Sequence, residues 1–211
     1  MRVFYFTDAT CALSDIALGR IKVSRISELN DPYELMAVKT NDKEIRSSLI
    51  KLKIKINETH GILCFSKSWE NPMLWSHYSD KHKGICLGFD INDSKVVPVG
   101  YISHRLQPEG NIIGDKVTRK FFDKLMSTKF AHWSYEEEVR LFIKLDKISF
   151  ESGMYFYDYD SDIMLFEVIL GPNCRYPIGK IRKLVNLLHD IPPESVKKSR
   201  LADKTFRVIE I

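Results

Sequence analysis

Apolar runs of strand length recur along this chain at irregular spacing, and this pattern limits its possible folds more than any other feature. The runs expected to form strands are residues 3–6, 21–23, 61–66, 85–89, 96–101, 138–145, 163–170 and 206–211. Apolar and polar residues alternate within 138–145, which predicts a half-buried strand there. Because strands outnumber helices and do not alternate with them regularly, we expect an α+β fold with mixed or antiparallel sheets, not a doubly wound nucleotide fold.

Helices are predicted between several of these strands. Capping residues and apolar periodicity predict them from Thr7 or Asp8 to Leu18, from Asn41 or Asp42 to Ile56, from Asn71-Pro72 onward, over 115–128 and over 178–188. The chain has no Pro/Gly/Ser-rich linker, so residues 1–211 are expected to form a single domain. It also has no G-x-G-x-x-G motif, no P-loop and no internal repeat.

Charge and cysteine usage restrict the class of protein only mildly. The 32 Lys and Arg against 28 Asp and Glu leave a net charge of +4, which is weak support for a nucleic-acid partner. The four cysteines form no C-x-x-C pair, which favours a reduced intracellular protein over a zinc ribbon. No apolar run approaches the roughly 20 residues of a membrane span. Since the acidic Asp8 comes too early for a signal peptide, we expect a cytoplasmic protein without a membrane partner.

Three stretches are unusually rich in residue types that carry chemistry. In the first, Asn30-Asp31-Pro32-Tyr33-Glu34, Asn and Asp before a proline predict a fixed turn with an exposed acid. In the second, residues 64–89, a buried strand would deliver Ser66 to the edge of a cleft. The helix that follows carries Trp75 and Tyr78 three residues apart, where they could stack on a planar ring or belong to an aromatic core.

The third stretch, from Trp133 to Arg140, places three acids in front of the alternating strand. In a strand, Glu136 and Glu138 point to the same face, with Arg140 beyond them. Carboxylates buried together raise one another's pKa, which suits a general base. At the surface the same residues would form only an ion-pair ladder of little stabilising value. Both interpretations follow from these residues.

Basic residues suggest one alternative function, a non-enzymatic nucleic-acid or protein-binding module. They gather on the helix predicted near 116–129, which carries Lys116, Arg119, Lys120, Lys124 and Lys129, and in a tail with Lys197, Lys198, Arg200, Lys204 and Arg207. A solvated face is the other interpretation of such runs. A further alternative is a metal-dependent nuclease or hydrolase that uses Asp31, Glu34, His77 and Glu136.

The order and the residue patterns of the three stretches resemble those of a family of uncharacterised bacterial and phage proteins, some of them encoded near defence genes. The pattern is N-D-P-(F/Y)-E, then C-F-S, then M-x-W-x-H-Y with a following H-x-G and C, and later W-x-Y-E-x-E-x-R. This chain supplies it at residues 30–34, 64–66, 73–89 and 133–140, and residues 168–174 fit as well. The family is a domain of unknown function, so this resemblance implies no settled activity.

The layout also resembles an ADP-ribosyltransferase, whose split-sheet fold carries three motifs on separate strands. The first, H-x-T, corresponds to residues 5–7, with Tyr5 in the histidine position and Thr7 in the threonine position. The second, aromatic-Ser-x-Ser, corresponds to residues 65–68, which include Ser66 and Ser68. The third, E-x-E, is Glu136 to Glu138. The resemblance implies a split sheet with flanking helices.

NAD is the substrate that this resemblance implies. Breaking its nicotinamide–ribose bond passes through an oxocarbenium-like state, which a carboxylate such as Glu138 would stabilise. Glu136 would then take a proton from the acceptor. Ser66 and Thr7 would position the ribose or the nicotinamide, with Tyr5 and Ser68 beside them as further NAD-binding residues.

The remaining roles implied by the resemblance belong to aromatic and cationic side chains. Trp75 or Tyr78 would stack on the nicotinamide, and Arg25 or Arg140 would hold the diphosphate. The resemblance implies no metal. It implies a macromolecular acceptor, protein or nucleic acid, and a toxin or phage-defence effector that an antitoxin could restrain.

Overall fold

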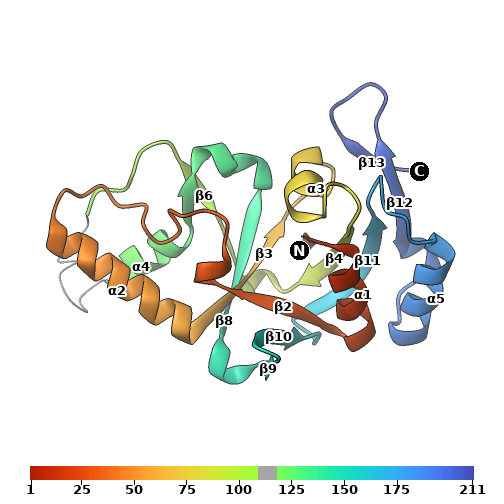
Figure 1. The fold of residues 1–211 in the computed structure, drawn as a ribbon, viewed down its shortest axis with the longest axis horizontal. Helices are drawn as coiled ribbons and strands as arrows, with labels where there is room; N and C mark the ends of the chain where they lie inside the picture. The colour runs from red at the N-terminus through yellow and green to blue at the C-terminus, as the bar shows by residue number, and fades with distance from the viewer. Residues whose placement is uncertain (109–117) are drawn as a thin grey trace.

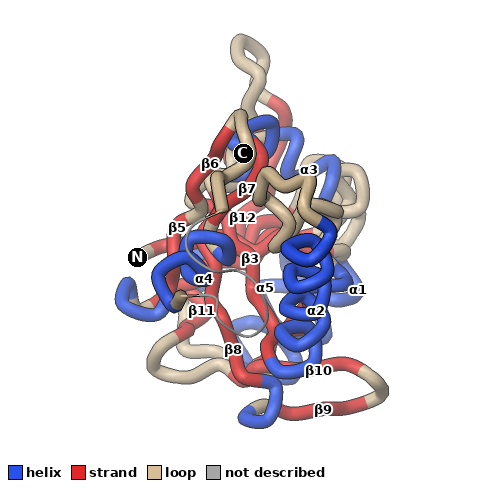
Figure 2. The backbone as a smooth tube through the Cα atoms, turned by 90° about the vertical axis from the view of Figure 1, so that its left-hand side faces the viewer, coloured by secondary structure: helices blue, strands red, loops and turns tan. Residues whose placement is uncertain are grey.

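Strands make up the centre of the molecule in the computed structural model, which describes residues 1–108 and 118–211 (Figures 1 and 2). The strands in these residues are β1 (Arg2–Thr7), β2 (Arg20–Arg25), β3 (His60–Ser66), β4 (Ile85–Ile91), β5 (Val96–Pro98), β6 (Gly100–Ile102), β7 (Thr128–Phe130), β8 (Glu138–Lys144), β9 (Ser149–Glu151), β10 (Met154–Asp158), β11 (Ile163–Leu170), β12 (Val196–Leu201) and β13 (Val208–Glu210). The α-helices are α1 (Ala9–Leu18), α2 (Lys43–Thr59), α3 (Pro72–Tyr78), α4 (Arg119–Met126) and α5 (Ile178–Leu188).

Two sheets organise these strands. The larger runs β13-β12-β11-β4-β1-β3-β2-β10-β9, with β8 and then β5 branching from β3. Its neighbours are antiparallel except for β11 and β12, which are parallel. The smaller sheet is the parallel pair β6 and β7. The α+β class with mixed pairing, expected from the sequence, is therefore confirmed. The hairpin of β12 and β13 projects beyond the body of the molecule (Figures 1 and 2).

β3 is the branch point of the large sheet. Along one edge it pairs with β8 over its whole length, from His60 to Ser66. Along the other edge it pairs with β2 at Gly61 and Ile62, and with β1 only at Ser66. β1 and β2 therefore diverge, and residues 63–65 of β3 have neither strand as a partner on this edge. The sheet is forked at this point.

Three hydrophobic clusters cover the two faces of the sheet. One face packs against α1 and α5 through residues such as Ile16 and Val185. The opposite face is divided, because α2 and α4 cover β3 and β8 while α3 covers β1 and β4. The fork lies where these last two clusters meet. Figure 1 shows α2 and α4 together at one end of the molecule, with α1 and α5 at the other.

Helix ends follow the local signals closely. The side chain of Asp8 accepts a hydrogen bond from the Cys11 N–H, and Gly19 closes α1 in the left-handed region at φ 61°. The side chains of Asp42 and Asn71 cap α2 and α3 in the same way. These residues satisfy N–H groups that have no partner inside the helix, so the boundaries were predictable from sequence.

Several predicted elements differ from the structure. The strand expected at 96–101 is broken at Val99, whose N–H donates to Glu138 of β8, and its halves join different sheets. Helix α4 starts at Arg119, with Thr118 as its cap; of the predicted helix, residues 115–117 lie outside the described residues. The predicted strand at 206–211 shortens to β13, and β7, β9, β10 and β12 were not predicted.

The expectation that β8 is half-buried is wrong. Its residues 138–141 are buried on both faces, because the polar face of the strand lies under α4 and the loop before α2 and not against solvent. Cys11, Cys64, Cys86 and Cys174 are free thiols. Among the described residues, no helix is long and apolar enough to cross a membrane.

Asp15 of α1 is buried, at 4% exposure, and this makes stability depend on pH. Burial outweighs the attraction of Arg20 and raises the pKa of Asp15 from 3.8 to about 7. The folded state then holds the proton more tightly than the unfolded state, so the free energy of unfolding falls as pH rises from 4 to 7. We expect Asp15→Asn to raise stability at pH 8 by about 1–3 kcal/mol, since one pKa unit is worth about 1.4 kcal/mol.

Chemical denaturation at pH 4 and pH 8 measures this effect. The exposed Asp190, also on the α5 side of the molecule, gives a matched control as Asp190→Asn, which should change stability at neither pH. A loss of stability in Asp15→Asn at pH 8 would show that the ionised carboxylate is stabilising.

Candidate active site

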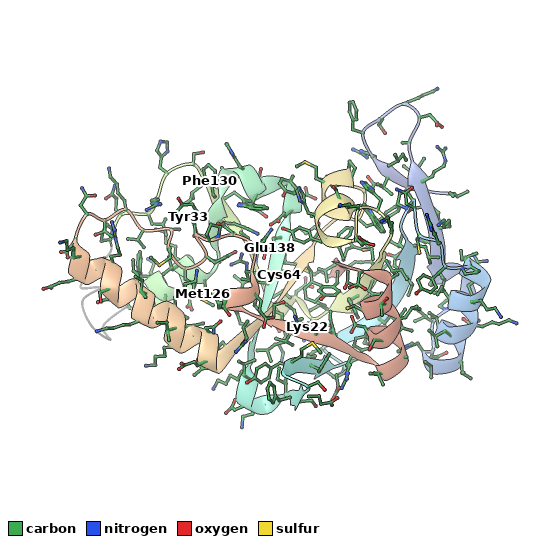
Figure 3. All side chains as sticks on the ribbon, in the orientation of Figure 1. Lys22, Tyr33, Cys64, Met126, Phe130 and Glu138 are labelled. Atoms are coloured by element: carbon green, nitrogen blue, oxygen red, sulfur yellow. The ribbon has the colours of Figure 1, made fainter. Side chains whose placement is uncertain are left out.

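A cavity of about 390 Å³ lies in the fork of the sheet, between α3 and the loop before α2. Residues from all three chemically rich stretches line it: Asn30 and Glu34 from the first, Ser66 and Tyr78 from the second, Glu136 and Glu138 from the third. In Figure 3, Glu138 and Cys64 lie at the centre of the molecule with Lys22 below them. Stretches separated by up to 100 residues thus contribute to one site.

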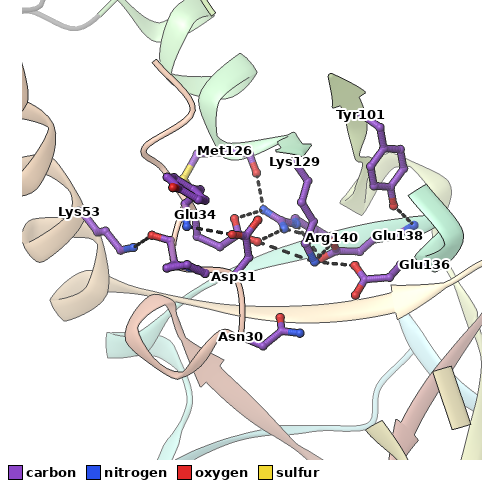
Figure 4. Close-up of polar contacts among 12 residues, drawn as sticks. Asn30, Asp31, Glu34, Lys53, Tyr101, Met126, Lys129, Glu136, Glu138 and Arg140 are labelled. Atoms are coloured by element: carbon purple, nitrogen blue, oxygen red, sulfur yellow. Dashed lines mark hydrogen bonds and ion pairs between the residues drawn. The ribbon is translucent and has the colours of Figure 1, made fainter. Parts of the chain in front are cut away.

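Arg140 does not itself line the cavity, but it pairs with two of the carboxylates that do, and it is 1% exposed (Figure 4). Its Nε and Nη2 donate to Glu138 at 2.7 and 3.1 Å. Nη1 and Nη2 donate to Glu34 at 2.9 and 2.5 Å, and Nη1 also donates to the Met126 carbonyl at 3.0 Å. These contacts use all five N–H donors of the guanidinium. Arg140 therefore cannot hold a diphosphate, contrary to the expectation from sequence, and Glu34 is buried instead of exposed.

Lys129 is the second cation of the cluster. It comes from β7 and is buried at 5% exposure, so its predicted place on a basic solvated helix face is wrong. Its Nζ donates to Glu136 at 2.5 Å and to Glu138 at 3.2 Å, and lies 4.9 Å from the Trp133 ring. Sequence reasoning missed this residue, because the charge run before it suggested a surface. The sequence feature that could have indicated its role is the position of Lys129 just before the acidic stretch.

Glu136 reaches the cluster by a different route from the one predicted. It ends the 3-10 helix η3 (Ala131–Glu136), and Glu137 then takes a left-handed conformation at φ 45° before β8 begins. The two carboxylates therefore meet through a turn and not through strand alternation. The Tyr78 hydroxyl donates to Glu136 and accepts from the Asn30 side chain at 2.6 Å. This chain of contacts joins the three stretches.

The environments of the two carboxylates shift their pKa values in opposite directions. Burial raises the pKa of Glu136 above its ordinary value of 4.5, although Lys129 opposes this. Burial acts on Glu138 as well, but Arg140 and Lys129 together hold the pKa of Glu138 below 4.5. Opposite shifts in neighbouring acids are typical of sites where one group stays ionised and the other exchanges a proton. With Glu34 included, three carboxylates face two cations, which leaves one net negative charge.

Ser66 is placed as expected. It is buried at the end of β3, directly between Phe4 of β1 and Glu138 of β8 in the sheet register, and it lines the cavity. Its Oγ accepts a hydrogen bond from the Ser68 N–H at 3.2 Å. Ser68 itself does not line the cavity, and its Oγ accepts from the Glu70 N–H in the following turn. Ser68 is therefore a turn residue in this structure.

Of the two β1 residues predicted to bind NAD, Tyr5 lines the cavity and Thr7 does not. Phe4 and Phe6 of β1 pack in the α3 cluster, whereas Tyr5 packs in the cluster on the opposite face, edge-on to Phe65 with ring centroids 6.1 Å apart. Alternation along the strand makes these two faces exclusive. The cavity is nevertheless lined by residues of both faces, Tyr5 and Phe65 among them. Thr7 lies two residues after Tyr5, on the same face of β1, and is not among the residues that line the cavity.

Trp75 cannot stack on a ligand either. It is fully buried, its ring meets Phe6 at a centroid distance of 5.1 Å, and its Nε1 donates to the Trp69 carbonyl at 2.6 Å. The aromatic-core interpretation is correct for this residue, and Tyr78 is the aromatic residue of that helix that lines the cavity. Arg25 lies outside the lining residues, paired with Glu28 at 3.3 Å.

No family model, curated protein or solved structure matches this chain. The site must therefore be interpreted from its own residues.

Three of the four residues named for the metal-dependent alternative have other partners, and the fourth, His77, lines the cavity. Arg140 pairs with Glu34, while Lys129 and Tyr78 occupy Glu136. Asp31 accepts a hydrogen bond from the Tyr33 N–H within its own turn. Among the described residues, no group of three or more His, Cys, Asp or Glu side chains is arranged to hold a metal ion.

The basic tail is largely committed to contacts within the chain. Lys197 pairs with Glu167, Arg200 with Asp203 and Arg207 with Glu70, while Lys198 donates to two carbonyls. On the predicted basic helix, Arg119 pairs with Asp123. These pairings reduce the positive surface that motivated a pure nucleic-acid-binding module.

Proposed function

We propose that this chain cleaves the nicotinamide–ribose bond of NAD and transfers ADP-ribose to an acceptor, as an ADP-ribosyltransferase-like enzyme. The observation that carries the proposal is the pair Glu136 and Glu138. They share one cavity, their pKa values are shifted in opposite directions, and both belong to the E-x-E segment. Cleavage of this bond requires one carboxylate that stays ionised and one that can take a proton.

Glu138 suits the first role. As the bond breaks, positive charge develops on the ribose, and a fixed anion in a buried cavity stabilises that charge strongly. The low pKa of Glu138, caused by Arg140 and Lys129, keeps it ionised over the physiological range. Glu136, whose pKa is raised by burial, can accept the proton of the attacking acceptor. The Tyr78 hydroxyl and Lys129 orient it.

Charge in the cavity supports the choice of substrate. The buried cluster has one net negative charge, which favours the cationic nicotinamide ring over a neutral or anionic group. Lys22 and Arg25 both pair with Glu28, at 3.1 and 3.3 Å, so two cations share one carboxylate near the opening. The diphosphate of NAD would bind beside this excess positive charge. Lys22 would then take the diphosphate-binding role that the sequence suggested for Arg140.

The sheet register adds support from the fold. The three motif strands of the resemblance are β1, β3 and β8, and they are direct neighbours at the fork, where Ser66 pairs with Phe4 and Glu138. Residues 63–65 have no strand partner on one edge of β3 and line the same cavity as the carboxylates, so this edge offers backbone groups for a planar amide such as that of nicotinamide. On this proposal the chain acts on cytoplasmic NAD as a toxin or phage-defence effector, and an antitoxin is the partner that would restrain it.

Incubation with NAD labelled in its adenosine half tests the proposal directly. We expect nicotinamide release by the purified protein, transfer of label when cell extract is added, and a rise in Tm with increasing NAD. Release of nicotinamide without transfer would identify a glycohydrolase. The absence of release, transfer and any Tm shift would overturn the proposal.

The raised pKa of Glu136 predicts the pH dependence of catalysis. A base must be unprotonated, so kcat/KM is expected to rise with pH through a midpoint above 4.5, the ordinary value for a glutamate. Glu136→Gln should lose this rise of kcat/KM with pH. Glu137→Gln, at an exposed neighbouring position, should keep it. A rise that persists unchanged in Glu136→Gln would assign the base to another group.

A further inference from the structure

A second cavity, of about 320 Å³, adjoins the candidate active site. It is bordered by the turn at residues 31–37, by the end of β6 and the turn after it, and by β7. Lys129 belongs to the walls of both cavities. A molecule in the second cavity would therefore lie next to the cation that bridges Glu136 and Glu138.

Aromatic side chains form the rim of this second cavity. Tyr33 is 51% exposed and Phe130 is 41% exposed, and both line it. The Arg105 guanidinium lies 4.8 Å from the centre of the Tyr33 ring, and the ring of His132 lies 4.4 Å from that of Phe130. Figure 3 shows Tyr33 and Phe130 on the same side of Glu138. Planar groups stack on exposed aromatic rings, and Arg105 and His132 each support one of these rings from one side.

The charges around these rings favour a phosphate-bearing ligand. Arg105 lines the cavity, and Lys53 of α2 reaches the neighbouring loop, where its Nζ donates to the Pro32 carbonyl at 3.4 Å (Figure 4). Among the described residues that line this cavity, Asp31 is the one acid; it is 3% exposed and accepts a hydrogen bond from the Tyr33 N–H. Stacking rings beside cations are the recurring means of binding single-stranded nucleic acid.

From this geometry we infer that the second cavity binds a base of single-stranded nucleic acid, stacked on Tyr33 and Phe130, as the acceptor of ADP-ribose. The acceptor role rests on the proposed function. In that reaction the bond between nicotinamide and ribose C1′ breaks, and nicotinamide leaves with the bonding electron pair. A nitrogen or oxygen of the base forms a new bond to C1′. The proton of that atom passes to Glu136 and then to water.

Fluorescence anisotropy with labelled 10-nucleotide RNA and DNA strands, without NAD, tests the binding site separately from catalysis. We expect both single strands to bind more tightly than the matching duplex. Tyr33→Ala and Phe130→Ala should each weaken binding by about 5- to 150-fold, the range for loss of one stacked base. Tyr33→Phe, which keeps the ring, should retain binding.

Phe206→Ala is the matched control. Phe206 is 99% exposed, follows Lys204 and precedes Arg207 in the sequence of the β12–β13 hairpin, and is not among the residues that line either cavity. Normal binding by this variant supports the inference. Equal loss in all three alanine variants, no binding by native protein, or label that appears only on proteins would overturn it while leaving NAD cleavage intact. Tyr33-dependent binding without NAD cleavage would instead overturn the proposed function and retain the base-binding cavity.

Discussion

Arg140→Met is expected to destabilise the protein by about 3–5 kcal/mol, because removing one partner from a buried ion pair leaves the other charge without compensation. Here two carboxylates, Glu34 and Glu138, lose their bidentate partner, and the Met126 carbonyl loses its donor. For a chain of this size the loss corresponds to a fall in Tm of about 10 °C. Thermal and chemical denaturation both measure it.

Two further variants make this expectation specific. Arg119 forms its ion pair with Asp123 at the surface with 87% of its side chain exposed, so Arg119→Met should cost less than about 1 kcal/mol. Adding Glu34→Gln to Arg140→Met removes one of the uncompensated charges and should restore part of the lost stability. If Arg140→Met were as mild as Arg119→Met, the cluster would not be a stabilising feature of the core.

Glu138→Gln is expected to lower nicotinamide release by about 10²–10³-fold, the effect of removing one preorganised charge-stabilising group. The substitution keeps the shape of the side chain and leaves two carboxylates facing two cations in the cluster. The variant should therefore fold. Its loss should appear mainly in kcat, since the positive charge on the ribose exists only in the transition state. KM should rise to a smaller extent, because the cluster also loses the net negative charge that favours the cationic nicotinamide ring.

Glu137→Gln controls for the removal of an acid at this point of the chain. Glu137 lies between the two buried acids but is exposed, so this variant should release nicotinamide at the native rate. Rates are compared per folded protein, with Tm measured for each variant. Native activity in folded Glu138→Gln would remove Glu138 from the mechanism.

Local features of this chain were predictable because neighbouring residues determine them. Asp8, Asp42 and Asn71 cap helices with their own side chains, and Gly19 ends α1 because it adopts a left-handed conformation without strain. Ser66 at the end of a buried strand was predicted for the same reason. Elements with weak or short patterns, such as β9 and β12, were missed, since their strand character comes from pairing with distant partners.

Residue types alone could not assign the roles of the charged and aromatic side chains. Arg140 and Lys129 are of residue types that usually bind ligands or lie at the surface. Both are instead buried as partners of carboxylates. Trp75 and Tyr78 lie on one short helix, but one is in the core and the other lines the cavity. Tyr5 and Phe4 are adjacent in sequence and face opposite sides of the sheet.

The sequence by itself therefore determined the fold class, the helix caps and the three stretches that carry the chemistry. Only the tertiary structure decided which of their side chains meet, because the deciding contacts join residues far apart in the chain. Glu34 and Arg140 are 106 positions apart, and Tyr78 and Glu136 are 58 apart. The fork of β3 brings these segments together, and burial in that fork gives Glu136 and Glu138 their different proton affinities.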